Sequence, residues 1–169
     1  MTRSMPPIKI PSERNPLFVV LDNIRSVYNV GSIFRTSDAA RISHLYLCGM
    51  TAYPPHPKID KTALGAISHV PWSHHVDACD VVRELKQQGF PIWACETGAL
   101  SQNYLESPYP SPLVLVFGHE VIGINPLILT LAEKQIEIPM AGHKSSLNVA
   151  TAYGIILFEV LRQYRSEPG

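Results

Sequence analysis

The chain has 169 residues, a length that fits one domain and leaves little for a second. Hydrophobic residues make up 46% of it, a share that supplies a sizeable core and excludes a disordered protein. Because 14 Lys and Arg balance 14 Asp and Glu, the composition excludes a general electrostatic attraction to nucleic acid. We therefore expect residues 1–169 to form a single domain.

The first half of the chain alternates short apolar runs with helical patterns. Residues 1–16 are expected to be an N-terminal extension ahead of a buried strand at 17–21, a run rich in β-branched and aromatic side chains. Residues 30–41 have the apolar spacing of a helix, and residues 44–48 are a second strand candidate. A loop with three prolines follows, and a short helix is predicted at 58–66.

The second half of the chain continues this alternation. A helix is predicted at 77–88 and a strand at 91–96. A loop rich in Pro and Ser leads into residues 113–117, the clearest strand pattern in the chain, and Pro126 suits the first turn of another helix. A last strand is predicted at 135–139. Strands that alternate with helices pair in parallel, so the sequence predicts an open, mostly parallel α/β sheet flanked by helices.

The predicted sheet also indicates where a ligand would bind. In open parallel sheets, ligands bind outside the carboxyl ends of the strands. This rule points to the segments that follow Glu96, Val116 and Ile138.

A long final helix is predicted over residues 146–165, with Ser145 or Ser146 as its N-terminal cap. Its apolar side chains lie nearly all round the helix, a pattern typical of helices buried on more than one side. We therefore expect this helix to pack on its own sheet and on a second copy of the chain, which would make the protein a homodimer.

Three segments combine glycines with polar side chains. Residues 29–35 (NVGSIFR) follow the first strand, and Gly31 is expected to let the backbone approach a ligand. Residues 117–123 (FGHEVIG) begin where the clearest strand ends. Residues 138–150 lead through a loop into the last helix, whose first N–H groups are free to bind the oxygens of a ligand. Each segment alone is also compatible with an ordinary turn or helix cap.

In this order, the three segments resemble the motifs of the SpoU/TrmH family of SPOUT RNA 2′-O-methyltransferases: N-x-G-x-x-x-R, F-G-x-E-x-x-G and I-P-M-x-G-x-x-x-S-L-N-V-A. The match spans residues 17–161, and residues 61–66 (KTALGA) resemble the family's loop between its first two motifs. The resemblance implies an open α/β sheet with a C-terminal deep trefoil knot, a homodimer, and S-adenosylmethionine bound by the knot loops. It also implies methyl transfer to a ribose 2′-hydroxyl in RNA.

The resemblance assigns two sets of residues on this chain. The cofactor-binding set comprises Thr97, Gly98, Gly118, Ile138, Met140, Ser146 and Leu147. The catalytic set comprises Arg35, Asn29, Glu120, Asn148 and Ser146. Glycines and apolar residues suit a flat slot for adenine, and a side chain at Gly118 is expected to fill that slot.

Arg35 is the catalytic residue that the resemblance implies, but arginine is a poor general base because its pKa lies above about 12. We therefore expect Arg35 to hold the adjacent phosphate and to stabilise the negative charge that develops on the attacking oxygen. Glu120 would orient Arg35, while Asn29 and Asn148 would position the ribose.

Other functions stay open at this point. One is a catalytically inactive RNA-binding protein of the same knotted fold; another is an ordinary nucleotide-binding α/β enzyme, although the chain has neither G-x-G-x-x-G nor G-x-x-x-x-G-K-[ST]. Members of the resembled family that lack a separate N-terminal RNA-binding domain often modify tRNA. We therefore expect tRNA rather than rRNA as the substrate.

The sequence predicts no metal site and no membrane partner. His69, His74 and His75 lack a carboxylate or thiolate at metal-ligand spacing and are expected in loops, and the three cysteines are expected to be structural thiols. No apolar run is long enough to cross a bilayer, and residues 1–16 lack the apolar stretch of a secretory signal. We therefore expect a cytoplasmic protein.

Overall fold

The strands of this protein form one parallel sheet. A computed structural model describes residues 4–166, so the first three residues of the predicted N-terminal extension lie outside it. The strands are β1 (Asn15–Asp22), β2 (Ile42–Cys48), β3 (Trp72–His75), β4 (Ile92–Cys95), β5 (Gln102–Asn103), β6 (Leu113–Gly118) and β7 (Lys134–Glu137). They join in the order β3-β2-β1-β6-β4-β7-β5, and each of these pairings is parallel. The predicted open parallel sheet is confirmed.

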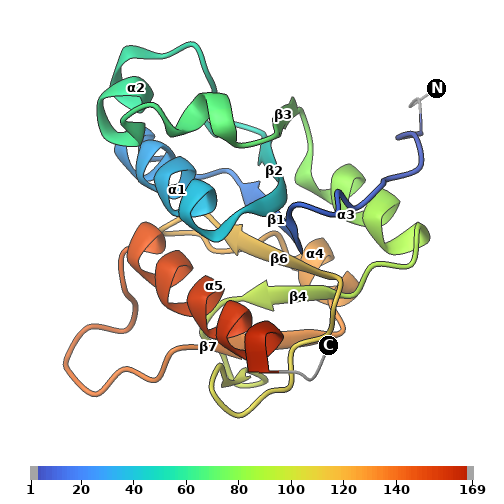
Figure 1. The fold of residues 1–169 in the computed structure, drawn as a ribbon. Coiled ribbons are helices and arrows are strands. Elements are labelled where there is room, and N and C mark those ends of the chain that lie inside the picture. The colour runs from blue at the N-terminus through green and yellow to red at the C-terminus, as the bar shows by residue number, and fades with distance from the viewer. Residues whose placement is uncertain (1–3, 167–169) are drawn as a thin grey trace.

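Helices cover both faces of the sheet (Figure 1). They are α1 (Val27–Ala40), α2 (Pro57–Ala63), the 3-10 helix η1 (Ala66–His69), α3 (Ala78–Gln87), α4 (Pro126–Leu131) and α5 (Val149–Ser166). Helices α1 and α5 pack on one face, and α3 and α4 pack on the other. Within residues 4–166, no helix is both long and apolar enough to span a membrane.

Strand β1 shows why the central strands are apolar at every position. Its side chains alternate between the two faces, so Leu17, Val19 and Leu21 join the core under α1 and α5. Phe18 and Val20 join the second core, under α3 and α4. All five are buried, which is the expected state of a parallel strand covered by helices on both sides.

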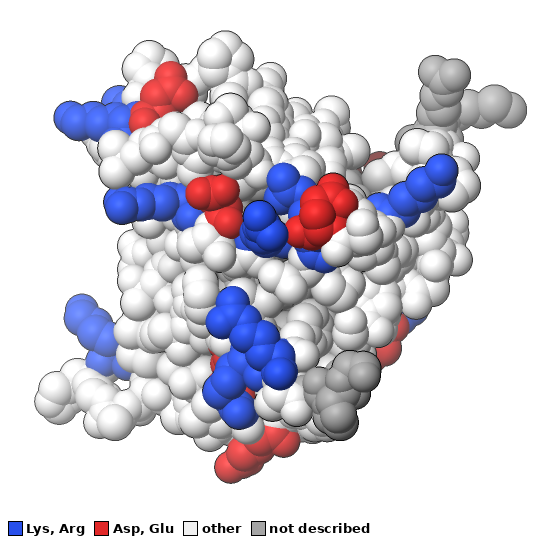
Figure 2. All heavy atoms as spheres, in the orientation of Figure 1, with Lys and Arg blue, Asp and Glu red and all other residues white. Residues whose placement is uncertain are grey.

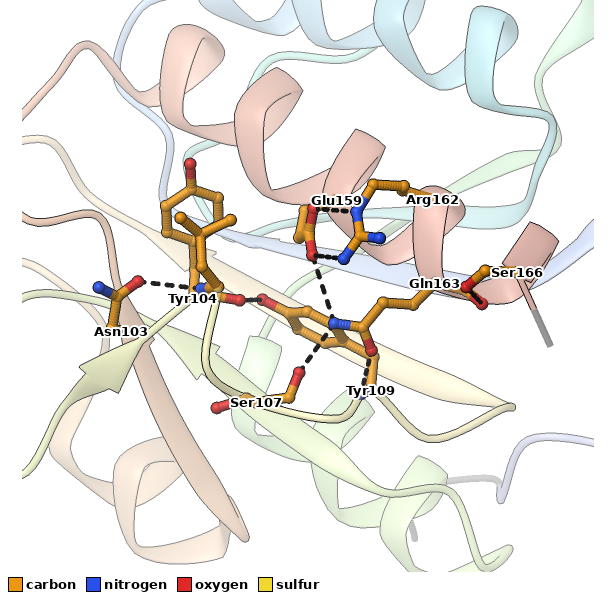
Figure 3. Close-up of polar contacts among 9 residues, drawn as sticks. Asn103, Tyr104, Ser107, Tyr109, Glu159, Arg162, Gln163 and Ser166 are labelled. Atoms are coloured by element: carbon orange, nitrogen blue, oxygen red, sulfur yellow. Dashed lines mark hydrogen bonds and ion pairs between the residues drawn. The ribbon is translucent and has the colours of Figure 1, made fainter.

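The segment between β5 and β6 is fastened to the C-terminal half of α5 (Figure 3). Gln163 accepts a hydrogen bond from the Tyr109 N–H at 2.9 Å and donates through Nε2 to the Ser107 carbonyl at 3.0 Å. Arg162 binds the buried Glu159 through two hydrogen bonds, of 2.9 and 2.7 Å, which lower the pKa of that carboxyl. This network holds the segment between β5 and β6 against the last helix.

Two helices begin at residues other than those predicted. The first begins at Val27 rather than at residue 30, because Ser26 caps it by accepting a hydrogen bond from the Asn29 N–H. The last begins at Val149, and the prediction that Ser145 or Ser146 caps it is wrong. Asn148 Oδ1 accepts hydrogen bonds from the N–H groups of residues 150 and 151, at 2.9 and 3.3 Å. Asparagine is as good an N-cap as serine, so sequence alone did not separate the candidates.

Two edge strands were not predicted, because neither has an apolar run. β3 has the sequence WSHH and β5 has only two residues, QN. His74 and His75 therefore lie on a strand rather than in a loop, and His69 ends the 3-10 helix. The short helix predicted at 58–66 ends at Ala63, because the next residue, Leu64, adopts a left-handed conformation.

Gly31 packs against a second helix instead of facing a ligand. It is buried, and a Cβ at this position would collide with Thr62 Oγ1 and lie 2.8 Å from the Ile59 carbonyl oxygen, both on α2. The glycine thus permits the close approach of α1 and α2. The prediction that Gly31 lets the backbone approach a ligand is wrong. Thr62, which Gly31 contacts, belongs to residues 61–66, the segment that resembles a family loop.

Gly31→Ala is expected to lower the free energy of unfolding by about 1–3 kcal/mol, because the added methyl group overpacks the contact between the two helices. Gly154→Ala is the matched control, since a Cβ there would meet only Thr36 Cγ2, at 3.9 Å. In α5 this control is expected to stabilise the protein by about 0.5–1 kcal/mol. Urea unfolding measures both, and equal effects of the same sign would contradict the packing argument.

Candidate active site

A pocket of about 550 Å³ opens at the carboxyl edge of the sheet, where β4, β6 and β7 end and α5 begins. Its walls are residues 95–97, 117–124, 136–138 and 145–149, together with Met140, Ala152 and Ile156. The strand-end rule selected the segments after Glu96, Val116 and Ile138, and Thr97, residues 117–124 and Met140 of these segments line the pocket. The pocket therefore lies at the predicted edge of the sheet.

Most of the residues assigned to cofactor binding line this pocket. They are Thr97, Gly118, Ile138, Met140, Ser146 and Leu147. Gly98 is not among the lining residues. It lies close to Gln135, whose Nε2 would be 2.9 Å from an added Cβ, and its N–H donates to Glu137 Oε2 at 3.4 Å.

Gly118 is required by the turn that follows β6. A Cβ on Gly118 would lie 2.5 Å from the Ile124 nitrogen and 2.7 Å from the Gly123 carbonyl carbon. An added side chain would therefore collide first with the backbone of this turn, at residues 123 and 124. The sequence predicts instead that it would fill the slot for adenine. His119 supports the same turn, because its Nδ1 accepts hydrogen bonds from Val121 and Ile122 at 3.0 Å. Sequence reasoning gave His119 no role.

Three residues of the predicted catalytic set are joined by hydrogen bonds at the rim of the pocket. Asn29 Nδ2 donates to Glu120 Oε1 at 3.3 Å, and Asn148 Nδ2 donates to Asn29 Oδ1 at 3.1 Å. Glu120 also accepts from the backbone N–H groups of Arg25 and Ser26, at 2.9 and 3.2 Å. The start of α1, the turn after β6 and the cap of α5 therefore meet in one polar network.

Two opposing effects act on the pKa of Glu120. Partial burial raises it, but the hydrogen bonds from backbone N–H groups, including those of Arg25 and Ser26, and from the Asn29 side chain outweigh burial. The net effect lowers the pKa below its ordinary value of 4.5. The carboxylate is therefore ionised at neutral pH and accepts hydrogen bonds only.

Arg35 lies outside this network, and the predicted contact between Glu120 and Arg35 is wrong. It is six residues beyond Asn29, which moves it about 9 Å along the helix and onto another face. The side chain is exposed, makes no hydrogen bond or ion pair with residues 4–166, and is not among the residues that line the pocket. Arg35 instead lies on the outer face of α1, with Ser32 and Ala39.

Sequence reasoning missed two carboxylates that hold the turn after β6, the buried Asp22 and the partly buried Glu96. Asp22 Oδ2, at the end of β1, accepts from the Asn125 N–H at 2.9 Å, and Glu96 Oε1, after β4, accepts from the Ile124 N–H at 3.0 Å. Burial raises the pKa of both groups, against the effect of these hydrogen bonds. An acidic residue directly after an apolar strand was the signal that could have identified them.

Seen as a whole, the fold and the pocket define an α/β protein with a ligand site at the carboxyl edge of a parallel sheet, completed by the segment before its last helix. Residues 16–158 match the model of the SpoU rRNA Methylase family. The chain belongs to this family. Among the groups of His, Cys, Asp and Glu in residues 4–166, none has the arrangement of a metal site.

Several relatives are named for RNA methylation. The chain is 36% identical over 161 residues to the tRNA (guanosine(18)-2′-O)-methyltransferase of Aquifex aeolicus, covering 95% of this chain and 75% of that protein. It is 34% identical over 155 residues to the 23S rRNA (guanosine-2′-O-)-methyltransferase RlmB of Vibrio parahaemolyticus, covering 91% of this chain. The chain spans only 62% of the length of this second relative.

A solved structure has the same fold and holds a cofactor. The crystal structure of the SpoU methyltransferase AviRb from Streptomyces viridochromogenes in complex with AdoMet superposes with a TM-score of 0.80 at 30% identity. The match covers 94% of this chain and 64% of AviRb. The trefoil knot concerns the path of the chain through a loop, which strand pairing does not determine, so it stays a prediction.

Proposed function

We propose that this protein transfers a methyl group from S-adenosylmethionine to a ribose 2′-hydroxyl of RNA. The observation that carries the proposal is the network of Asn29, Glu120 and Asn148 at the rim of the pocket. A binding module has no evident need for three polar groups held together at the mouth of a cavity. The names of the relatives support the same reaction.

The pocket suits the proposed cofactor in size and chemistry. A volume of about 550 Å³ is within the range of small-molecule sites, and the walls combine apolar side chains with the free N–H groups before α5. Ile138, Met140 and Leu147 provide the apolar surface that an adenine ring requires. When bound, S-adenosylmethionine supplies the methyl group, and its sulfur keeps the electron pair of the broken C–S bond.

The chain's own residues would orient the ribose and stabilise charge. Asn29 and Asn148 present amide groups to the ribose, and Glu120 holds Asn29 in place. Ser146 lines the same pocket. Arg35 would bind the neighbouring phosphate and stabilise the oxygen as its proton passes to water, acting from the outer face of α1 rather than through Glu120.

The proposal includes a homodimer, which would bring Arg35 to the pocket of the other subunit. Helices α1 and α5 pack side by side, and the outer face of α5 exposes Ile155 (36%) and Phe158 (43%). Leu147, which lines the pocket just before α5, is also 38% exposed. Apolar side chains in this arrangement favour a second copy as the covering surface. Light scattering that finds a monomer at micromolar concentration would contradict this part.

The substrate in this proposal is tRNA rather than rRNA, in the cytoplasm. On the face in Figure 2, basic and acidic side chains are interspersed and much of the surface is uncharged. RNA would therefore be held locally, around the pocket, rather than by a broad basic surface. The names of the relatives include both classes of RNA, so the assignment to tRNA is the part most in need of a test.

Two measurements test the proposed reaction. Isothermal titration calorimetry is expected to show S-adenosylmethionine binding at one site per chain. Mass spectrometry of nucleosides from tRNA and rRNA, incubated separately with protein and cofactor, is expected to find a 2′-O-methylated nucleoside in tRNA. Cofactor binding without methylation of either RNA would favour an inactive RNA-binding protein, and the absence of cofactor binding would refute the proposal.

A further inference from the structure

The pocket at the carboxyl edge carries a negative charge. Its walls include three carboxylates, those of Glu96, Glu120 and Glu137, and no lysine or arginine is among its described lining residues. Charges of one sign in a partly enclosed cavity favour a cationic ligand over a neutral ligand of the same shape. The occupants of this pocket should therefore be discriminated by charge.

The three carboxylates differ in how far their charge is already compensated. The oxygens of Glu120 accept hydrogen bonds from two backbone N–H groups and from Asn29, and they face the start of α1. Glu137 accepts a long hydrogen bond, 3.4 Å, from Gly98. Glu96 uses Oε1 to bind the Ile124 N–H, while its Oε2 has no hydrogen-bond partner within residues 4–166. Glu96 thus has a free acceptor in the wall of the pocket.

Glu96 is also held rigidly on several sides. Its N–H donates to the Ile136 carbonyl at 3.0 Å, and its own carbonyl accepts from Ser101 Oγ at 2.7 Å and from Gln135 Nε2 at 3.1 Å. The carboxylate packs directly on Gly123, where a Cβ would collide with Oε1. A carboxylate fixed in this way needs little reorganisation when a cation enters the pocket.

We propose that Glu96 makes this pocket selective for the positively charged methyl donor, S-adenosylmethionine, over its product, S-adenosylhomocysteine. The inference rests on the proposed function. The donor has a sulfonium where the product has a neutral thioether, so methyl transfer removes one positive charge from the ligand. A fixed carboxylate stabilises the ligand with the additional positive charge more than the product, which favours replacement of spent cofactor by fresh donor.

Calorimetry with both ligands, at low ionic strength, tests this selectivity on the full chain. The wild type is expected to bind S-adenosylmethionine more tightly than S-adenosylhomocysteine. Glu96→Gln is expected to weaken donor binding about tenfold and product binding little, because its amide oxygen can still accept from Ile124 while the charge is gone. Glu106→Gln, an exposed glutamate outside the pocket, is the matched control and should change neither affinity.

The outcomes separate this inference from the proposed function. A wild type that binds neither ligand refutes the proposed function, and the selectivity with it. If Glu96→Gln weakens both ligands equally, Glu96 only positions the turn after β6 and the charge selectivity is wrong. If Glu96→Gln unfolds, Glu137→Gln provides a second test. It should lower the preference for S-adenosylmethionine over S-adenosylhomocysteine by a smaller factor. An unchanged preference in Glu137→Gln would overturn the proposal.

Discussion

Arg35→Ala is expected to slow methyl transfer about 100-fold or more, the effect typical of losing a group that stabilises charge in the transition state. Cofactor affinity and thermal stability should not change, because the side chain is exposed and makes no hydrogen bond with residues 4–166. Arg35→Lys should fail as well, since a point charge does not reproduce the planar fork of a guanidinium on a phosphate. Single-turnover rates and calorimetry with S-adenosylmethionine measure the two effects separately.

The matched control for Arg35 is Arg83→Ala. Arg83 lies on α3, on the opposite face of the sheet, where it forms an exposed ion pair with Asp80. Removing it takes away the same charge without touching the proposed site, so the rate should stay near that of the wild type. Near-normal turnover of Arg35→Ala, with the cofactor bound, would defeat the catalytic assignment.

The proposed dimer adds a complementation test. Mixed subunits of Arg35→Ala and of a variant with a defective pocket should regain activity, if the arginine of one subunit serves the pocket of the other. Neither variant alone would be active. If the subunits exchange and the mixture stays inactive, Arg35 acts with the pocket of its own subunit and not with that of the other.

Gly118→Ala is expected to weaken S-adenosylmethionine binding about 10- to 100-fold, which corresponds to overpacking of about 1–3 kcal/mol. The added Cβ would meet backbone atoms of Gly123 and Ile124, at 2.5 to 2.7 Å, and these cannot rotate aside as a side chain would. The turn must therefore shift, and the hydrogen bond from Ile124 to Glu96 weakens with it. Calorimetry measures the loss.

Gly142→Ala is the control for Gly118. Gly142 lies in the exposed loop that leads to α5, and no atom lies within 4 Å of a Cβ built there. Its substitution should leave cofactor affinity within about twofold, since exposed positions rarely change stability by more than 0.5 kcal/mol. Equal losses at the two glycines would show that general disturbance of the pocket loops, rather than the close approach at Gly118, controls binding.

The order of the motifs allowed most of the pocket to be predicted. Apolar runs at residues 17–21 and 113–117 identified two adjacent central strands, and polar residues after such strands lie at the ligand edge of a parallel sheet. Six of the seven cofactor residues that the resemblance implies line the pocket, four of them at or after strand ends and two just before the last helix. Gly98 is the exception, one residue past the wall at Thr97.

The partners of individual side chains could not be predicted in this way. Nothing in the local sequence shows that Gly31 faces Thr62, or that Glu120 binds Asn29 rather than Arg35. Asp22 and Glu96 were missed for a related reason, because their function is to bind backbone that lies far away in the chain.

By itself, the sequence determined the parallel sheet, its ligand edge and the family, because apolar periodicity and ordered motifs are local properties of a chain. Only the tertiary structure decided that Asn29, Glu120 and Asn148 meet at one rim while Arg35 points outward. The physical reason is that the hydrogen bonds from Asn29 to Glu120 and to Asn148 join residues 91 and 119 positions apart in the chain. The short distances that a hydrogen bond requires between such segments exist only after the chain has packed.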